Sequence, residues 1–213
     1  MKLGVWKISR KAQTEAITLV LITGIIIALV GVAYMWGKPT IEKRSVVTQF
    51  TSAVRFMEDL DSRIVDMAGS CSFEGACEEA LDLPVPGLIT VDEASNTIAY
   101  RFSVNQPLLT TGEVLFNTVD NSSFARYGET PGVISLRGNG TQQSGLYELV
   151  FSIRYRELDS DEPWKGYKIQ LVKSGKAGGS SRIMISYGGP ETQPGAAHNS
   201  GDLVVSKIRV QPI

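Results

Sequence analysis

The sequence of 213 residues is poor in the side chains that most enzymes and metal sites use. It has one histidine, His198, which argues against a histidine-based metal site, and two cysteines, which cannot form a four-thiolate zinc cage. It also lacks a surplus of charge, since 21 Lys and Arg stand against 22 Asp and Glu. Nucleic-acid binding needs cations that neutralise phosphates, so no nucleic-acid partner is expected. These shortages argue against an enzyme and predict no catalytic residue, cofactor or metal.

Charge is absent altogether from residues 16–37, close to the N-terminus. As a helix, these roughly 22 residues would extend about 33 Å, enough to cross a hydrocarbon core of about 30 Å. Four cations precede the run, with no acid among them: Lys2, Lys7, Arg10 and Lys11. By the positive-inside rule, they keep the N-terminus in the cytoplasm and direct the rest of the chain outward.

Three interpretations of this apolar segment differ in where the chain is cut. A secretory signal peptide has an apolar region of about 7 to 15 residues followed by a small-residue cleavage site. The only suitable exit here is the sequence Gly31-Val32-Ala33. A permanent single-span anchor explains the length and the flanking charges without any cut. In the third interpretation, the cut lies before the apolar run, near Lys11.

The residues around Lys11 resemble a known processing signal. The sequence RKAQTE occupies residues 10–15, directly before the apolar run that starts AITLVLI. This arrangement resembles the class III signal peptide of archaeal type IV pilins and archaellins. In that family, a membrane-embedded prepilin peptidase cuts on the cytoplasmic side, and the apolar helix stays in the mature subunit. The resemblance implies a cut between Ala12 and Gln13, with residues 1–12 as the signal peptide.

Glu15 separates this chain from some relatives of that family. It would be the third mature residue, whereas bacterial type IV pilins usually carry a glutamate at the fifth. Archaellins commonly have glycine-containing sequence there, so the chain looks more like an adhesive-type pilin. A freed Gln13 amine would pair with Glu15 of the same or a neighbouring subunit, because a carboxylate beside an apolar run is costly to bury alone. In a simple anchor, Glu15 would instead be a solvated acid.

Small residues inside the apolar run suit contact between helices. Gly24 and Ala28 have the small-xxx-small spacing that lets two helix backbones approach closely, and Gly31 adds a further small position. Such residues are also common in solitary membrane helices, so a helix bundle and an anchor both stay open. Tyr34 and Trp36 stand where an outer aromatic belt would lie.

Beyond Pro39, which is expected to kink the helix, the chain becomes amphipathic. Apolar residues recur at three- and four-residue steps, which predicts one packed face up to residue 68. They are Val47, Phe50, Val54, Met57, Leu60, Ile64 and Met67. The intervening charged residues, Asp61 among them, are expected on the polar side. We therefore expect one long helix over residues 13–68, apolar over 13–37 and amphipathic over 38–68, the stem of a pilin-like lollipop.

Cys71 and Cys77 lie in a junction over residues 69–82. In an extracellular chain, two cysteines at this spacing most simply form a disulfide across a small loop; two unpaired thiols are the alternative. On the chain-entropy model, so short a closure stabilises by only about 2 to 3 kcal/mol. The bond would fasten the helix to the head rather than hold the whole fold.

From Leu83 onward, the hydrophobic period changes from helical to two, which is typical of strands. Residues 97–104 alternate most clearly. Further strands are predicted over residues 113–118, 132–136, 146–155, 167–172, 182–187 and 203–211, with turns at 105–107, 137–140, 174–179 and 188–190. About seven or eight short strands without intervening helices predict an antiparallel sandwich or partial barrel, of which an Ig-like sandwich is favoured. The fold class is α+β, with a β head over residues 83–213.

The predicted loops contain few candidates for chemistry. Residues 173–181 lack the glycine and the Ser or Thr that a phosphate-binding loop requires. Residues 159–162 offer oxygen atoms without the spacing of an EF-hand, so a solvated loop is expected. His198 has no assignable catalytic partners and is expected at the surface. Asn121 and Asn139 satisfy the N-glycosylation pattern and fall in predicted loops.

These features together predict a structural subunit. The resemblance implies a homo-oligomeric helical filament outside the cell, with residues 13–37 in its core and the heads displayed for adhesion. Before assembly, the subunit would sit in the cytoplasmic membrane with its head outside, and its partners would be a prepilin peptidase, an assembly platform protein and an ATPase. The alternative is a single-span membrane-anchored extracellular β domain that binds a partner and never polymerises. A hydrolase comes third.

Overall fold

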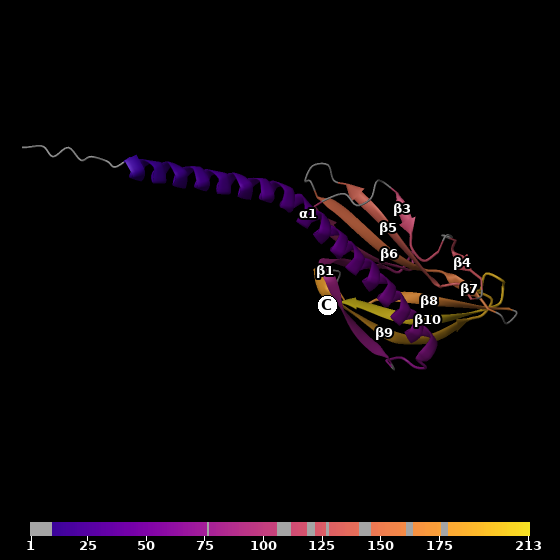
Figure 1. The fold of residues 1–213 in the computed structure, drawn as a ribbon. Coiled ribbons are helices and arrows are strands. Elements are labelled where there is room, and N and C mark those ends of the chain that lie inside the picture. Colours follow the sequence, from indigo (N-terminus) through magenta and orange to yellow (C-terminus); the bar gives the residue numbers. More distant parts are fainter. Residues whose placement is uncertain are drawn as a thin grey trace, which may run out of the picture. The chain divides into compact units, whose positions relative to one another are not determined.

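The computed structural model describes residues 10–75, 77–105, 112–118, 122–126, 128–140, 146–160, 164–175 and 179–213. Within them, one helix is followed by ten strands (Figure 1). The elements are α1 (Arg10–Ser70), β1 (Glu78–Asp92), β2 (Thr97–Val104), β3 (Glu113–Leu115), β4 (Phe124–Ala125), β5 (Gly132–Gly140), β6 (Tyr147–Tyr155), β7 (Glu157–Asp159), β8 (Lys165–Lys173), β9 (Gly179–Gln193) and β10 (Asp202–Pro212). The chain divides into two compact units, Met1–Ser45 and Val46–Ile213.

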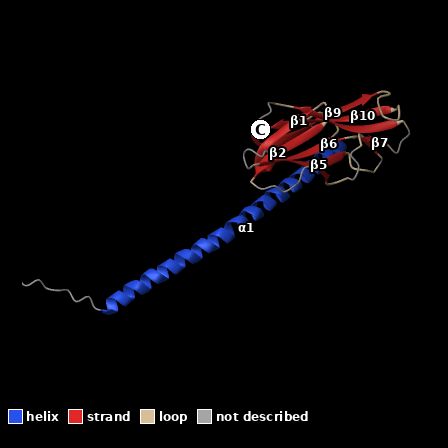
Figure 2. Cartoon of the chain, turned by 90° about the horizontal axis from the view of Figure 1, so that it is seen from above, coloured by secondary structure: helices blue, strands red, loops and turns tan. Residues whose placement is uncertain are grey.

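The predicted fold class, a long N-terminal helix followed by a β head, is confirmed (Figure 2). The ten strands form one continuous sheet in the order β3-β5-β6-β2-β1-β9-β10-β8-β7-β4, in place of the two sheets of an Ig-like sandwich. Most neighbouring strands are antiparallel, but β8 pairs with β10 and β4 pairs with β7 in parallel. The physical reason for the single sheet is that the second part of α1 supplies the other side of the core.

One face of α1 is buried in the unit Val46–Ile213. Ala53, Met57, Leu60 and Ile64 are fully buried, and their three- and four-residue spacing places them on one side of the helix. They share a single hydrophobic core with inward-facing residues of the sheet. The predicted stripe is therefore confirmed in its centre, whereas Val47, at its start, is 52% exposed.

Asn96 ties together two strands that are not neighbours in the sheet. It lies in the turn between β1 and β2, is buried, and has a φ of 53°, which asparagine tolerates better than most residues. Its Nδ2 donates to the carbonyl oxygens of Tyr155 (3.0 Å) and Ile169 (2.6 Å), and its Oδ1 accepts from the Leu171 amide (2.8 Å). Tyr155 ends β6 and the other two residues belong to β8. The sheet is thus fastened in a curled form around the helix.

Strand β1 begins at Glu78, inside the segment predicted as an irregular junction. Pro84 and Pro86 interrupt its alternating pattern, which explains why the pattern did not reveal it. The pairing of β1 with β9 shifts register between Asp82 and Gly87, so both prolines fall where the ladder is already broken. A strand with prolines at such an irregularity loses no regular hydrogen bond.

Two segments predicted as turns lie inside strands. Residues 137–140 belong to β5 and residues 188–190 belong to β9. Gly189 has a φ of 94°, and the pairing of β9 with β10 shifts register between Lys207 and Ile208, opposite this glycine. The glycines therefore mark a bulge within a long strand rather than its end.

We predict that Asn96→Ala lowers the free energy of unfolding of the head by about 3 kcal/mol. Three hydrogen bonds are lost, and the buried backbone groups they served are left unpaired. Thermal and chemical denaturation of the full chain in detergent, followed by circular dichroism, measures the change. Asn105→Ala, at an exposed asparagine, is the matched control. A change at Asn96 as small as that of the control would contradict the role assigned to this residue.

Candidate functional site

Residues 17–36 of α1 form an apolar surface that is exposed on every side. The large side chains in this segment are all at least half exposed, from 52% at Ile22 to 81% at Trp36. A helix that is apolar all round is suited to lipid or to the interior of a helix bundle rather than to the surface of a soluble protein. Its length and composition are sufficient for it to cross a membrane.

The small residues of this helix leave open space on its surface. A Cβ atom built on Gly24 or Gly31 would have no neighbouring heavy atom within 4 Å. Ala28 is exposed one turn after Gly24, on the same side of the helix. The hydroxyl of Thr23 donates to the carbonyl oxygen of Leu19 at 2.7 Å, so it needs no water partner. A second helix backbone can approach this side closely.

The residues predicted to be processed lie at the start of α1. Lys11, Ala12 and Gln13 belong to its first turns, since the helix begins at Arg10. Their side chains and that of Glu15 lie outside the described part of the chain. The cut site and the pairing of Gln13 with Glu15 therefore stay predictions.

The apolar surface ends within about one turn after Trp36. Lys38 and Glu42 form an ion pair with 3.9 Å between nitrogen and oxygen. Pro39 lies inside the helix, and the nearby Thr40 hydroxyl donates to the carbonyl oxygen of Trp36 at 3.2 Å. The change from apolar to charged side chains over so few residues is typical of a membrane–water boundary.

The predicted disulfide between Cys71 and Cys77 is present at the end of α1. The loop it closes is held to the sheet by three further contacts. The Gly75 amide donates to the carbonyl oxygen of Tyr187 at 2.8 Å, the Tyr187 amide donates to that of Cys77 at 3.0 Å, and Glu74 pairs with Arg209. The helix is thereby fastened to β9 and β10, as expected for this junction.

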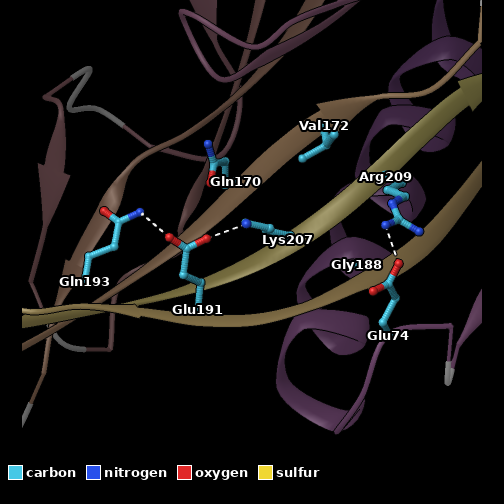
Figure 3. A pocket seen from close by; sticks show the side chains of 8 residues that line it. All are labelled: Glu74, Gln170, Val172, Gly188, Glu191, Gln193, Lys207 and Arg209. Atoms are coloured by element: carbon cyan, nitrogen blue, oxygen red, sulfur yellow. Dashed lines mark hydrogen bonds and ion pairs between the residues drawn. The ribbon is translucent and has the colours of Figure 1, made fainter.

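A polar pocket of about 500 Å³ lies beside this loop on β8, β9 and β10 (Figure 3). Its charged side chains neutralise one another. Lys207 pairs with Glu191, which also accepts a hydrogen bond from Gln193 at 3.2 Å, and Arg209 pairs with Glu74. The hydrogen bond from Lys207 is the main cause of a lowered pKa of Glu191, so this carboxylate is ionised at neutral pH. The pocket offers paired charges rather than a poised acid or base.

His198 is exposed, as predicted, and its ring stacks on Phe124 with 4.0 Å between ring centroids. Its backbone amide donates to Oε1 of Glu157 at 2.6 Å. Of the acidic loop at residues 159–162, positions 161 and 162 lie outside the described residues. Among the residues that the structure does describe, no group of three or more His, Cys, Asp and Glu side chains is placed to hold a metal ion.

Of the two predicted glycosylation sites, the structure describes only one. Asn121 lies outside the described residues. Asn139 is exposed, but it belongs to β5, where it pairs with Glu148, and not to the predicted loop. The pairing of β5 with β6 continues further than the glycines at 138 and 140 suggested.

Asp61 is a buried carboxyl that the sequence analysis placed on the polar side of the helix. It is only 9% exposed, four residues after Met57 and three before Ile64, both of which are in the core. This spacing from two core residues is the sequence signal that places Asp61 on the buried face of the helix. A Cβ atom on Gly132 would lie 2.1 Å from its Oδ1, so a larger residue there would displace this carboxyl. Neither this oxygen nor the hydroxyl of Tyr155 has a hydrogen-bond partner of normal geometry.

Comparisons with known protein families, with curated proteins and with solved structures find no match for this chain. The feature that demands a partner is the exposed apolar helix.

Burial raises the pKa of the Asp61 carboxyl, and the hydrogen bond with the neighbouring Tyr155 hydroxyl offsets only part of this rise. The folded state then binds the proton more tightly than the unfolded state, so stability is lost as the pH rises through the folded-state pKa. We predict that Asp61→Asn raises the melting temperature at pH 7 and that its advantage shrinks toward pH 4. Melting curves of both chains across this range measure it. A variant less stable at pH 7 would show that the carboxylate is paired.

Proposed function

We propose that this chain is a structural subunit of an archaeal type IV pilus-like surface filament. The observation that carries the proposal is the helix surface at residues 17–36, which is apolar on every side and exposed, in a chain whose head has its own core. In a filament, helices of neighbouring subunits would cover this surface. The β head would be displayed outside for adhesion, and the covering helices would belong to other copies of this chain.

Assembly would transfer the helix from the bilayer into the bundle. Contact with other helices then replaces contact with lipid, and close packing at small residues such as Gly24 and Ala28 supplies the attraction. By the resemblance of residues 10–15 to a class III signal peptide, a prepilin peptidase would first cut between Ala12 and Gln13. A platform protein in the membrane and a cytoplasmic ATPase would then drive extraction.

The ends of the apolar segment support the proposed orientation before assembly. Lys2, Lys7, Arg10 and Lys11 precede it, and such an excess of cations stays on the cytoplasmic side. Tyr34 and Trp36 are largely exposed at its other end, where amphipathic rings favour a membrane interface. The head would therefore face outward.

The outermost strands of the described sheet support assembly through helices rather than through strand exchange. Strand β3 has three residues and strand β4 has two, so neither offers a long free edge. The side chain of Asn117 covers more of β5, donating to the carbonyl oxygen of Gly132 at 2.6 Å and accepting from the Ile134 amide at 2.9 Å. A donated strand would have to displace these bonds.

The alternative function is a membrane-anchored extracellular β domain that binds a partner and never polymerises. The same apolar helix supports it, because the helix is long enough to cross a membrane by itself. The two functions differ in whether close helix packing is required.

We predict that the double substitution Gly24→Leu and Ala28→Leu abolishes filaments and leaves membrane insertion intact. Leucine keeps the helix apolar but prevents close approach of a second backbone. Electron microscopy of the fraction sheared from the cells measures filaments, and membrane fractionation measures insertion. Ala33→Leu is the control, since Ala33 lies nine residues from Gly24 and hence on the opposite side of the helix. Normal filaments in the double variant would contradict the packing role of Gly24 and Ala28.

A further inference from the structure

The interface between α1 and the sheet contains one buried carboxyl among apolar side chains. Leu60 and Ile64, on either side of Asp61 in the helix, are fully buried in the core that the helix shares with the strands. Asp61 itself is 9% exposed. Among the buried polar and charged residues in the described part of the chain, it is the one that α1 contributes. A titratable group therefore lies where the helix is held to the sheet.

The strands leave a slot for this carboxyl. Gly132 of β5 and Tyr155 of β6 are directly paired in the sheet. Residues paired in this way point to the same face of a sheet, so both positions face the helix. Gly132 has no side chain, and Asp61 fills the space that one would occupy, with its Oδ1 2.1 Å from the position of a Cβ atom there. We call this space, bounded by Gly132 and Tyr155, the carboxyl slot.

The carboxyl slot suits a protonated carboxyl better than a carboxylate. The buried Tyr155 hydroxyl is the hydrogen-bonding side chain beside Asp61. A carboxylate only accepts hydrogen bonds, and one hydroxyl cannot serve both of its oxygens, whereas a protonated carboxyl also donates one. Burial raises the pKa of Asp61 by more than this hydrogen bond lowers it. Burial also raises the pKa of Tyr155 well above its usual value, so Asp61 is the member of the pair that titrates.

No cation in the described part of the chain forms an ion pair with Asp61. The buried guanidinium of Arg156 instead pairs with Glu129 at 3.5 Å. Arg63 on α1 pairs with one acid of the helix and one acid of β1. Glu58, about one turn before Asp61, is an exposed acid, and the facing position on β5 is the glycine of the slot. A buried charge without a counter-ion is costly, so an ionised Asp61 is more stable nearer to water.

We propose that Asp61, Gly132 and Tyr155 form a proton-operated latch between α1 and the sheet. With Asp61 protonated, the carboxyl stays in the slot and the helix is docked on β5 and β6. Loss of the proton drives the carboxyl out of the slot, and the part of α1 after Ala53 separates from these strands more often. Because the docked state binds this proton more tightly than the open state, docking weakens as the pH rises. The latch belongs to the head and does not depend on filament formation.

Hydrogen–deuterium exchange of the full chain in detergent micelles, read by mass spectrometry between pH 4 and pH 8, tests the latch. The rates are first corrected for the dependence of chemical exchange on pH. We expect the amides of residues 53–67 to lose protection by roughly tenfold as the pH rises, since one pKa unit corresponds to a tenfold change. Strand β2 should keep its protection. In Asp61→Asn, which keeps the shape of the side chain without its charge, protection of residues 53–67 should not change with pH.

Glu58→Gln, which neutralises the exposed acid about one turn away, is the matched control and should behave like the parent. Tyr155→Phe is a second variant. Loss of its hydroxyl raises the pKa of Asp61 further, so the loss of protection with rising pH should be larger than in the parent. Protection that is independent of pH in the parent, or that changes equally in Asp61→Asn, would overturn the inference. An equal loss in β2 would also overturn it, because the head would then unfold as a whole.

Discussion

The exposed apolar surface at residues 17–36 is the constraint on which the rest of this molecule depends. Removal of one large apolar side chain from water is worth about 1.5 to 3 kcal/mol, and this segment presents such side chains on every face. No part of the described chain covers them. The helix must therefore meet lipid, other helices or both in turn, and a subunit that moves from membrane to filament satisfies the constraint at each stage.

The second part of the same helix packs against the sheet and not against lipid or other helices. From Val46 onward, only one face is apolar, and a curled sheet covers that face. Asn96 holds the curl by joining β6 to β8, and the disulfide loop fastens the helix end to β9 and β10. The head is thus a self-contained core, which allows the apolar segment to exchange partners without disturbing it. Asp61 is the exception, a carboxyl whose burial in this core raises its pKa and costs stability at neutral pH.

Parts of this arrangement could be predicted because they rest on local pattern. The apolar run, the buried stripe around Met57 and Leu60, the disulfide and strand β2 all follow from spacing and composition. Other parts depend on contacts between distant residues. The parallel pairing of β8 with β10 and the bridge made by Asn96 leave no mark in the neighbouring sequence. The early start of β1 was hidden by its prolines.

Some features of the candidate sites could likewise be predicted from the sequence, and others could not. The small residues of the helix are visible in the sequence, and the structure adds that the space around Gly24 and Gly31 is open. The stack of His198 on Phe124 was not predictable, because the two residues are far apart in the chain. The left-handed conformation of Trp164 has no sequence signal of its own either. Asp61 did have such a signal, since its spacing from Met57 and Ile64 places it in the core.

The most direct test of the central claim is the N-terminal sequence, by mass spectrometry, of the protein sheared from the surface of cells that express it. The account predicts a mature chain that begins at Gln13, with the apolar helix retained, in a fraction that contains filaments. A chain that stays in the membrane and begins at Met1 would contradict it and identify an anchored domain. A released chain that begins at Tyr34 would contradict it more strongly, because the apolar helix would have been discarded.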